Sequence, residues 1–264
     1  MPPQARKRPG AALPVRKPAK GGHIGMVAEL VAALQRTFSR HRNSKDAADM
    51  TRYVKGKFPY YGLKAPLRRQ LAGEVIGSWK HAHGQQEIDK GVARQLLSAL
   101  YSCEERELHY VGAEVCSGLL RKGLVGRDFL PVVKHGVTTK SWWDTVDIFA
   151  ASSMSPYLLA CGGGSPSPEL LQEMDKWAVS SNLWLRRTAI LCQLKLKGQT
   201  DLRRLESYIV SNASDKDFFV RKAIGWALRE YAKHDPKWVR QFLTRHKSQL
   251  SALSVREASL HLSK

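Results

Sequence analysis

Hydrophobic residues recur along the chain at intervals of three and four, the spacing that places them on one face of an α-helix. In the first such stretch, over 23–38, Met26, Leu30, Leu34 and Phe38 share a face. No stretch of alternating hydrophobic and polar residues indicates a β-strand. The pattern therefore predicts an all-α chain of about a dozen helices with short connections.

Turn-forming residues divide this pattern into helices. Asn43 and Ser44 can cap a helix that continues to about residue 54, and Pro66 is suited to open the next helix after a break at 57–66. A loop over 162–168 is rich in glycine, serine and proline, and Pro168 begins the helix after it. Further helices are expected over 67–79, 88–100, 104–121, 126–135, 141–159, 169–179, 183–196, 202–211, 218–233, 237–246 and 253–262.

A short motif repeats every 35 residues in the C-terminal half. LRRT (185–188) aligns with VRKA (220–223) and VREA (255–258), each near the start of a helix. Helix pairs that recur at about 35–45 residues are typical of HEAT- and armadillo-type superhelices. We therefore expect a helical-repeat superhelix with a basic concave groove; a compact helical bundle is the alternative.

The basic residues of this motif would form a row along the groove, where they could meet the phosphates of a duplex. The arginine common to the three copies (Arg186, Arg221 and Arg256) is expected to pair with an acid of the neighbouring repeat. Arg187 and Lys222 are expected to contact phosphates, because the shared arginine already takes the structural position.

The composition adds a strong positive charge to this picture. The 264 residues include 43 lysines and arginines and 23 acids, a formal net charge of +20. Six of the basic residues lie in 1–22, a segment without acids, so 23–264 retains an excess of +14. Such a body favours a polyanionic partner, with nucleic acid as the leading candidate over a generic solubility charge.

Residues 1–22 are rich in proline, glycine, lysine and arginine, and we expect them to be disordered because they hold too few apolar residues to fold. Their two basic clusters fit a nuclear-targeting signal, a DNA-binding arm, an organellar transit peptide or a solvated tail. Residues 23–264 are expected to form a single helical-repeat domain. We expect a monomer in the nucleus or the cytoplasm.

Other kinds of site are disfavoured. The four cysteines (Cys103, Cys116, Cys161 and Cys192) form no CxxC pair, and the nine histidines lack metal-ligand spacing, so no metal or cofactor is expected. Widely spaced cysteines fit buried thiols in a reducing compartment. No apolar run reaches membrane-spanning length, and no secretory signal follows the first methionine.

The most distinctive segment is SWWDTVDIFA (141–150), with two tryptophans and two acids in a helical stretch. Residues four apart share a helix face, so Trp143 and Asp147 point the same way. Asp147 lies mid-helix without a local structural reason, whereas Asp144 fits a helix start or an ion pair. Trp142 falls off this face and is expected in the core, as is Trp184; a core position is also the alternative for Trp143.

Four segments together resemble the AlkD-type DNA alkylation repair glycosylases. They are FPYYGLKAP (58–66), WWDTVD (142–147), LWLRRTAIL (183–191) and FVRKAIGWALREYA (219–232), in the family's order. The resemblance covers most of the folded chain. It implies a HEAT-like superhelix that clasps duplex DNA and excises positively charged N3- and N7-alkylated purines in base excision repair, without flipping the damaged base.

The resemblance also implies roles for individual residues. Asp147 takes the place of the catalytic carboxylate, Trp143 and Trp226 that of the aromatic pair beside it, and Arg187 that of a backbone-contacting arginine. One carboxylate suffices for this chemistry, because an alkylated purine leaves as a charged group and the carboxylate can stabilise the positive sugar.

An aromatic residue of the N-terminal loop is implied to face DNA as well; we assign Tyr61, and Tyr60 is the alternative. The alternative function is a non-catalytic HEAT-repeat protein that recognises damaged or branched DNA, since some family members lack the aromatic and acidic set. A protein-binding helical adaptor is a third hypothesis, which the charge of the body disfavours.

Overall fold

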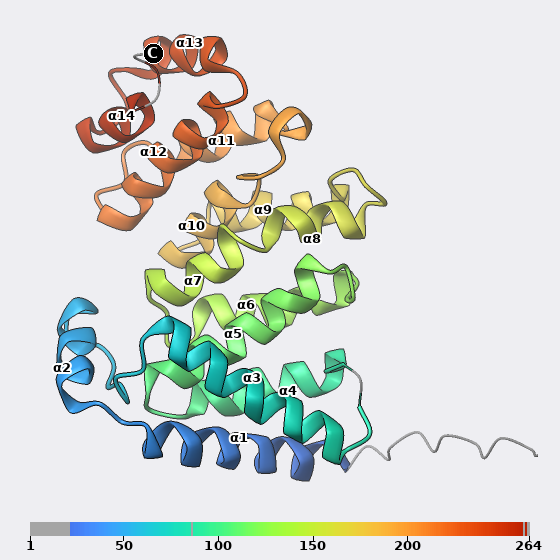
Figure 1. Ribbon diagram of the computed structural model, residues 1–264. Coiled ribbons are helices and arrows are strands. Elements are labelled where there is room, and N and C mark those ends of the chain that lie inside the picture. Colours follow the sequence, from blue (N-terminus) through green and yellow to red (C-terminus); the bar gives the residue numbers. More distant parts are fainter. Residues whose placement is uncertain (1–21, 86, 261, 263–264) are drawn as a thin grey trace, which may run out of the picture.

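The protein is described by a computed structural model over residues 22–85, 87–260 and 262. The predicted N-terminal extension lies outside these residues, apart from Gly22, which already belongs to the first helix. The described chain contains 14 α-helices and two short 3-10 helices, η1 and η2, and none of it forms a β-strand. The prediction of an all-α fold is therefore confirmed, and the helices stack from α1 at one end to α14 at the other (Figure 1).

The stack begins with three N-terminal helices, of which α1 packs against α3 and α4. Their bounds are α1 (Gly22–Arg40), α2 (Ser44–Tyr53) and α3 (Ala65–Ala82). Asn43 caps α2 as predicted, since its side chain accepts a hydrogen bond from the Asp46 backbone N–H at 3.1 Å.

From α4 onward the helices form an outer and an inner row. Successive inner helices pack on one another, and each outer helix packs against an inner one, which is the repeat arrangement that the sequence predicts. The outer row consists of α4 (Lys90–Ser102), α6 (Leu130–Thr138), α9 (Pro168–Ala178), α11 (Leu202–Ser211) and α13 (Pro236–His246). The inner row consists of α5 (Arg106–Arg121), α7 (Trp143–Ala150), α10 (Leu183–Leu191), α12 (Phe218–Ala232) and α14 (Ala252–Ser259), with α8 (Met154–Cys161) following α7.

Two predicted helices differ in the structure: one is divided in two and the other ends earlier. The segment 141–159 forms α7 and α8 rather than one helix, because Pro156 lacks an N–H and its ring would clash with the carbonyl of residue 152 in a continuous helix. The buried Ser153 hydroxyl fills the break, 2.7 Å from the Ile148 carbonyl oxygen. The helix expected over 183–196 ends at Leu191, and η2 (Lys197–Gln199) follows.

The loop between α2 and α3 is fixed by a buried acid of α5. The backbone N–H groups of Tyr61, Gly62 and Leu63 donate to the Glu107 carboxylate at 3.1, 2.8 and 3.0 Å. Gly62 has a φ of 91°, and a Cβ there would lie 2.1 Å from the Asn43 carbonyl oxygen. Only glycine fits this position, so the loop is anchored both to α5 and to the start of α2.

We predict that Gly62→Ala lowers the free energy of unfolding by at least about 3 kcal/mol. The positive φ alone costs about 1–3 kcal/mol, and the clash of the new Cβ with the Asn43 backbone adds to that cost. Gly73→Ala is the matched control: Gly73 lies in α3, a Cβ there meets no atom within 4 Å, and the change should stabilise by about 0.5–1 kcal/mol. Urea unfolding followed by circular dichroism measures both. Equal stability of the two variants would contradict the role given to Gly62.

Candidate active site

An ion pair between α7 and α10 lies at the centre of the inner row. Nε of Arg187 donates to Oδ1 of Asp147 at 2.8 Å and Nη2 donates to Oδ2 at 2.7 Å, which is bidentate geometry. Nη1 of the same guanidinium donates to the Phe219 carbonyl of α12 at 2.6 Å. Three inner helices therefore meet at one arginine side chain.

The two partners differ in their access to solvent. The Arg187 side chain is 4% exposed, whereas the Asp147 side chain is 17% exposed. Burial raises the pKa of the Asp147 carboxyl above its ordinary value, and the hydrogen bonds and charge of Arg187 act in the opposite direction. A carboxylate with a perturbed pKa that still reaches solvent is a candidate for chemistry.

Asp147 opens into a hollow of about 390 Å³, here called the carboxylate hollow. Its wall comes from the end of α7, the turn after α10 and the last turns of α12, and its lining includes Asp147, Ile148, Ser152, Lys195, Trp226 and Glu230. The end of α7 at the Pro156 break therefore brings the carboxylate to the edge of this hollow rather than into the middle of a longer helix.

A second hollow of about 500 Å³, here called the aromatic hollow, adjoins the first at Trp226, which lines both. Its wall carries Tyr53, Trp143, Phe218, Phe219 and Trp226, with Lys55, Lys222 and Arg229 beside them. The ring of Trp143 meets that of Tyr53 edge to face, with centroids 5.8 Å apart. The aromatic pair predicted from sequence thus lines this hollow, and Asp147 lies in the adjoining one.

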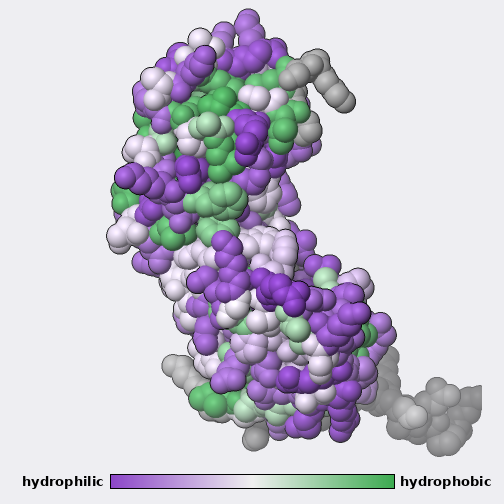
Figure 2. Space-filling view, turned by 90° about the vertical axis from the view of Figure 1, so that its left-hand side faces the viewer, coloured by the Kyte–Doolittle hydropathy of each residue, from purple (hydrophilic) through white to green (hydrophobic). Residues whose placement is uncertain are grey.

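A third hollow extends the surface toward the N-terminal helices. It shares Tyr53 with the aromatic hollow and Asp144 and Ile148 with the carboxylate hollow, so the three form one groove along the inner row. Figure 2 looks onto the side where α2 and the first turns of α7, α10 and α12 lie. There a pale band of intermediate hydropathy separates a largely hydrophilic lower part from an upper part of mixed character.

Trp142 and Asp144 are packed into the scaffold, and each also lines part of the groove. Trp142 and Trp184 are 9% and 8% exposed, and their rings meet edge to face with centroids 5.8 Å apart. Asp144 pairs with the fully buried Arg106, whose Nε donates to Oδ2 at 3.1 Å, and accepts a hydrogen bond from the Tyr110 hydroxyl at 2.6 Å. This network ties the start of α7 to α5.

The aromatic assignment in the N-terminal loop needs a correction. Tyr61 is 4% exposed, packs edge to face on Phe38 and lines no part of the groove, because the anchored loop turns its ring inward. Tyr60 is equally buried but lines the third hollow. Sequence reasoning missed Tyr53, which is 72% exposed beside Trp143. The one signal for it was a bulky aromatic residue closing the polar helix α2.

The expected row of free cations is also different in the structure. Arg187 is buried against Asp147, and Lys222 pairs with Glu257 at 2.5 Å, so neither side chain is free, and their phosphate contacts stay predictions. Arg186 pairs with Asp215 at 2.8 Å, as expected for the shared arginine. The same expectation was wrong for the arginines at 221 and 256, which have no ion pair within the described chain.

The described part of the chain holds no group of three or more histidine, cysteine, aspartate or glutamate side chains that could bind a metal ion. None of the described helices combines the length and apolar character that a membrane crossing requires.

The all-helical fold is consistent with the family to which the chain is similar. A family model described as DNA alkylation repair enzyme matches residues 34–262, and the chain belongs to this family. A solved structure from Enterococcus faecalis, described as a predicted DNA alkylation repair enzyme, is 30% identical with a TM-score of 0.67. The match covers 84% of this chain and 97% of that one. No curated protein matches the chain.

Membership of this family implies DNA binding, and two cations of the aromatic hollow are held by one acid. Nζ of Lys222 and Nη1 of Arg229 donate to Glu257 of α14 at 2.5 and 2.6 Å. The hydrogen bond from Lys222 lowers the pKa of Glu257, which is therefore ionised at neutral pH. A phosphate that approaches either cation must compete with this carboxylate.

We predict that Glu257→Gln tightens duplex binding at low salt and steepens the log–log salt dependence by about one to two, because both cations become available to phosphates. Glu87→Gln is the control, since Glu87 forms an exposed pair with Lys122 outside the groove. Fluorescence anisotropy over a salt series measures both variants. An unchanged slope for Glu257→Gln would show that these cations do not meet DNA.

Proposed function

We propose that this protein is a monofunctional DNA glycosylase that removes N3- and N7-alkylated purines from duplex DNA, acting as a monomer without a cofactor. The observation that carries the proposal is the Asp147 carboxylate, which Arg187 fixes in bidentate geometry while one edge opens into the groove beside Trp226. The family supports a repair enzyme, and the carboxylate suggests its chemistry.

The substrate class suits a site with a single carboxylate. A purine alkylated at N3 or N7 already carries a positive charge, so the glycosidic bond can break without a general acid. Its electron pair passes to the purine, which becomes neutral, and positive charge develops on the deoxyribose. A fixed carboxylate can stabilise that charge, as in other glycosyl transfers.

Asp147 can also complete the hydrolysis. Water adds to C1′ of the sugar, its proton passes to the Asp147 carboxylate, and the carboxylate then releases the proton to solvent. Because Arg187 orients the carboxyl group and opposes the effect of burial on its pKa, this step requires no rearrangement of the site. Chemistry at the sugar fits a carboxylate that lies at the wall of an open groove, and we propose that the damaged base stays in the helix.

The two tryptophans assist from the side of the aromatic hollow. Aromatic faces attract cations at about 0.5–2 kcal/mol, so Trp143 and Trp226 can favour both the charged lesion and the developing sugar cation. Trp226 links the two hollows, and the Arg187 guanidinium carbon lies 5.9 Å from its ring centroid. The exposed Tyr53 extends the same aromatic wall.

We predict that the wild-type protein releases 7-methylguanine from methylated duplex DNA and that Asp147→Asn slows release by at least roughly a hundredfold, since a neutral amide cannot stabilise the sugar cation. Duplex affinity should be nearly unchanged. Asp128→Asn is the control. Asp128 lies in η1 (Arg127–Phe129), and its exposed carboxylate forms an ion pair with Lys90 of α4. Single-turnover base release measured by chromatography decides between the enzyme and a non-catalytic DNA-binding protein.

We predict that Arg187→Gln moves the acidic limb of the base-release pH profile to higher pH. The carboxylate must be ionised to act, so activity falls as pH drops through its pKa. Removing Arg187 leaves burial unopposed, which raises that pKa further. A uniform loss of activity with an unmoved limb would show that Arg187 serves only the fold.

A further inference from the structure

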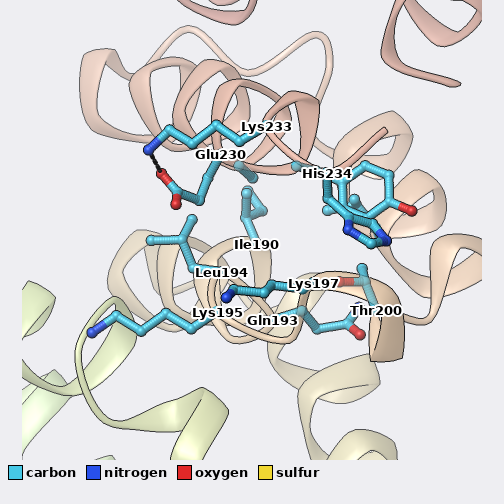
Figure 3. A pocket seen from close by; sticks show the side chains of 12 residues that line it. Ile190, Gln193, Leu194, Lys195, Lys197, Thr200, Glu230, Lys233 and His234 are labelled. Carbon is cyan, nitrogen blue, oxygen red and sulfur yellow. Dashed lines mark hydrogen bonds and ion pairs between the residues drawn. The ribbon is translucent and has the colours of Figure 1, made fainter. Parts of the chain in front are cut away.

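A fourth hollow, here called the rim hollow, lies between the C-terminal ends of α10 and α12 and measures about 620 Å³. Apolar side chains form much of its wall, with lysines at 195, 197 and 233 around them (Figure 3). In that view the ammonium groups of Lys195 and Lys197 extend to the same side, opposite the His234 ring.

The rim hollow is continuous with the carboxylate hollow. Leu194, Lys195 and Glu230 line both of them, so Lys195 stands between Asp147 and the rim hollow. A ligand in the carboxylate hollow therefore has both Asp147 and Lys195 in the wall around it.

The charges of the rim hollow select an anion. Lys233 donates to Glu230 at 2.6 Å and is neutralised there, whereas Lys195 and Lys197 are exposed and have no ion pair within the described chain. In the neighbouring hollows Arg187, Lys222 and Arg229 are each bound to an acid, and Lys55 is the cation there without an ion pair within the described chain. Two free ammonium groups repel a cationic alkylpurine and attract a phosphate.

The segment that carries these lysines is held rigidly. The buried Gln193 side chain accepts from the Asp201 N–H at 2.8 Å and donates to the Asp201 carbonyl at 3.1 Å, which closes the loop around η2. The Lys195 N–H donates to the buried Ser155 hydroxyl at 3.0 Å. Lys197 has a φ of 52°, a conformation that a non-glycine residue adopts only when its surroundings impose it.

We propose that Lys195 and Lys197 bind a backbone phosphate of the lesion-bearing DNA strand, next to the nucleotide whose deoxyribose faces Asp147. Successive phosphates of one strand are only about 3.4 Å apart along the helix axis, so a lysine that shares a hollow with the carboxylate lies within reach of the same strand. This inference rests on the proposed function. The two lysines act as positioning residues for the reacting nucleotide.

The test uses the full chain and a duplex with one tetrahydrofuran abasic analogue, so that binding is measured without turnover. Lys195→Gln/Lys197→Gln should weaken binding roughly tenfold per lysine, the loss of one charge-assisted hydrogen bond each, and lower the salt slope by about two. Lys195→Arg/Lys197→Arg should bind like the wild type. Lys134→Gln/Lys237→Gln, at exposed positions of the outer helices α6 and α13, is the charge-matched control.

A neutral methylphosphonate placed at single positions identifies the phosphate. A methylphosphonate next to the abasic analogue, in the strand that carries the analogue, should weaken binding by the wild type. The same substitution should leave binding by the Lys195→Gln/Lys197→Gln variant unchanged. Equal affinity of that variant and the wild type would overturn the proposal. The proposal would also fail if the lysine substitutions abolished only the effect of methylphosphonates in the complementary strand. Wild-type protein that releases no methylated base would instead refute the glycosylase function, whatever these binding results are.

Discussion

The bidentate pair of Asp147 and Arg187 is the interaction on which the rest of the site depends. It joins α7 to α10, and the third nitrogen of the guanidinium joins both to α12. Removing one member of such a buried pair costs about 3–5 kcal/mol, because the other charge is left without a partner. The same pair orients the carboxylate toward the groove, so the register of three helices and the geometry of the candidate chemistry have a common origin.

The groove combines a positive chain with mostly paired cations. Arg187, Lys222 and Arg229 all face acids within the protein, so the net charge of +20 does not appear there as a row of bare cations. Such pairs hold side chains in place and release a cation only to a competing anion. The unpaired lysines of the rim hollow then provide fixed points of attraction, and the aromatic wall between these regions suits a cationic lesion and sugar.

The sequence predicted the fold well because its signals are local. Helical spacing, the Asn43 cap and the proline at 168 predict helices that the structure contains. The repeat at 185, 220 and 255 predicts the stacking of inner helices. The break at Pro156 was the one strong local signal that was overlooked, and it is the break that brings Asp147 to the end of α7.

Side-chain partners were harder to predict, because they depend on contacts between distant segments. The pairing of Arg187 with Asp147 joins residues 40 positions apart, and the inward position of Tyr61 depends on Glu107, 46 positions away. Tyr53 carried no motif, and only its exposure beside Trp143 reveals it. The predicted division of the tryptophan-rich segment into scaffold and groove residues is less sharp in the structure, because Trp142 lines the aromatic hollow and Asp144 lines the carboxylate hollow while both also hold the fold together.

The central claim is that Asp147 and Arg187 act as one unit in breaking the glycosidic bond. A double-mutant cycle of Asp147→Asn and Arg187→Gln, measured by single-turnover release of 7-methylguanine at a pH where the wild type is fully active, tests it most directly. The double variant should be no slower than Asp147→Asn alone, since Arg187 acts through the carboxylate. Rate losses that simply multiply would contradict this, because the two residues would then contribute independently.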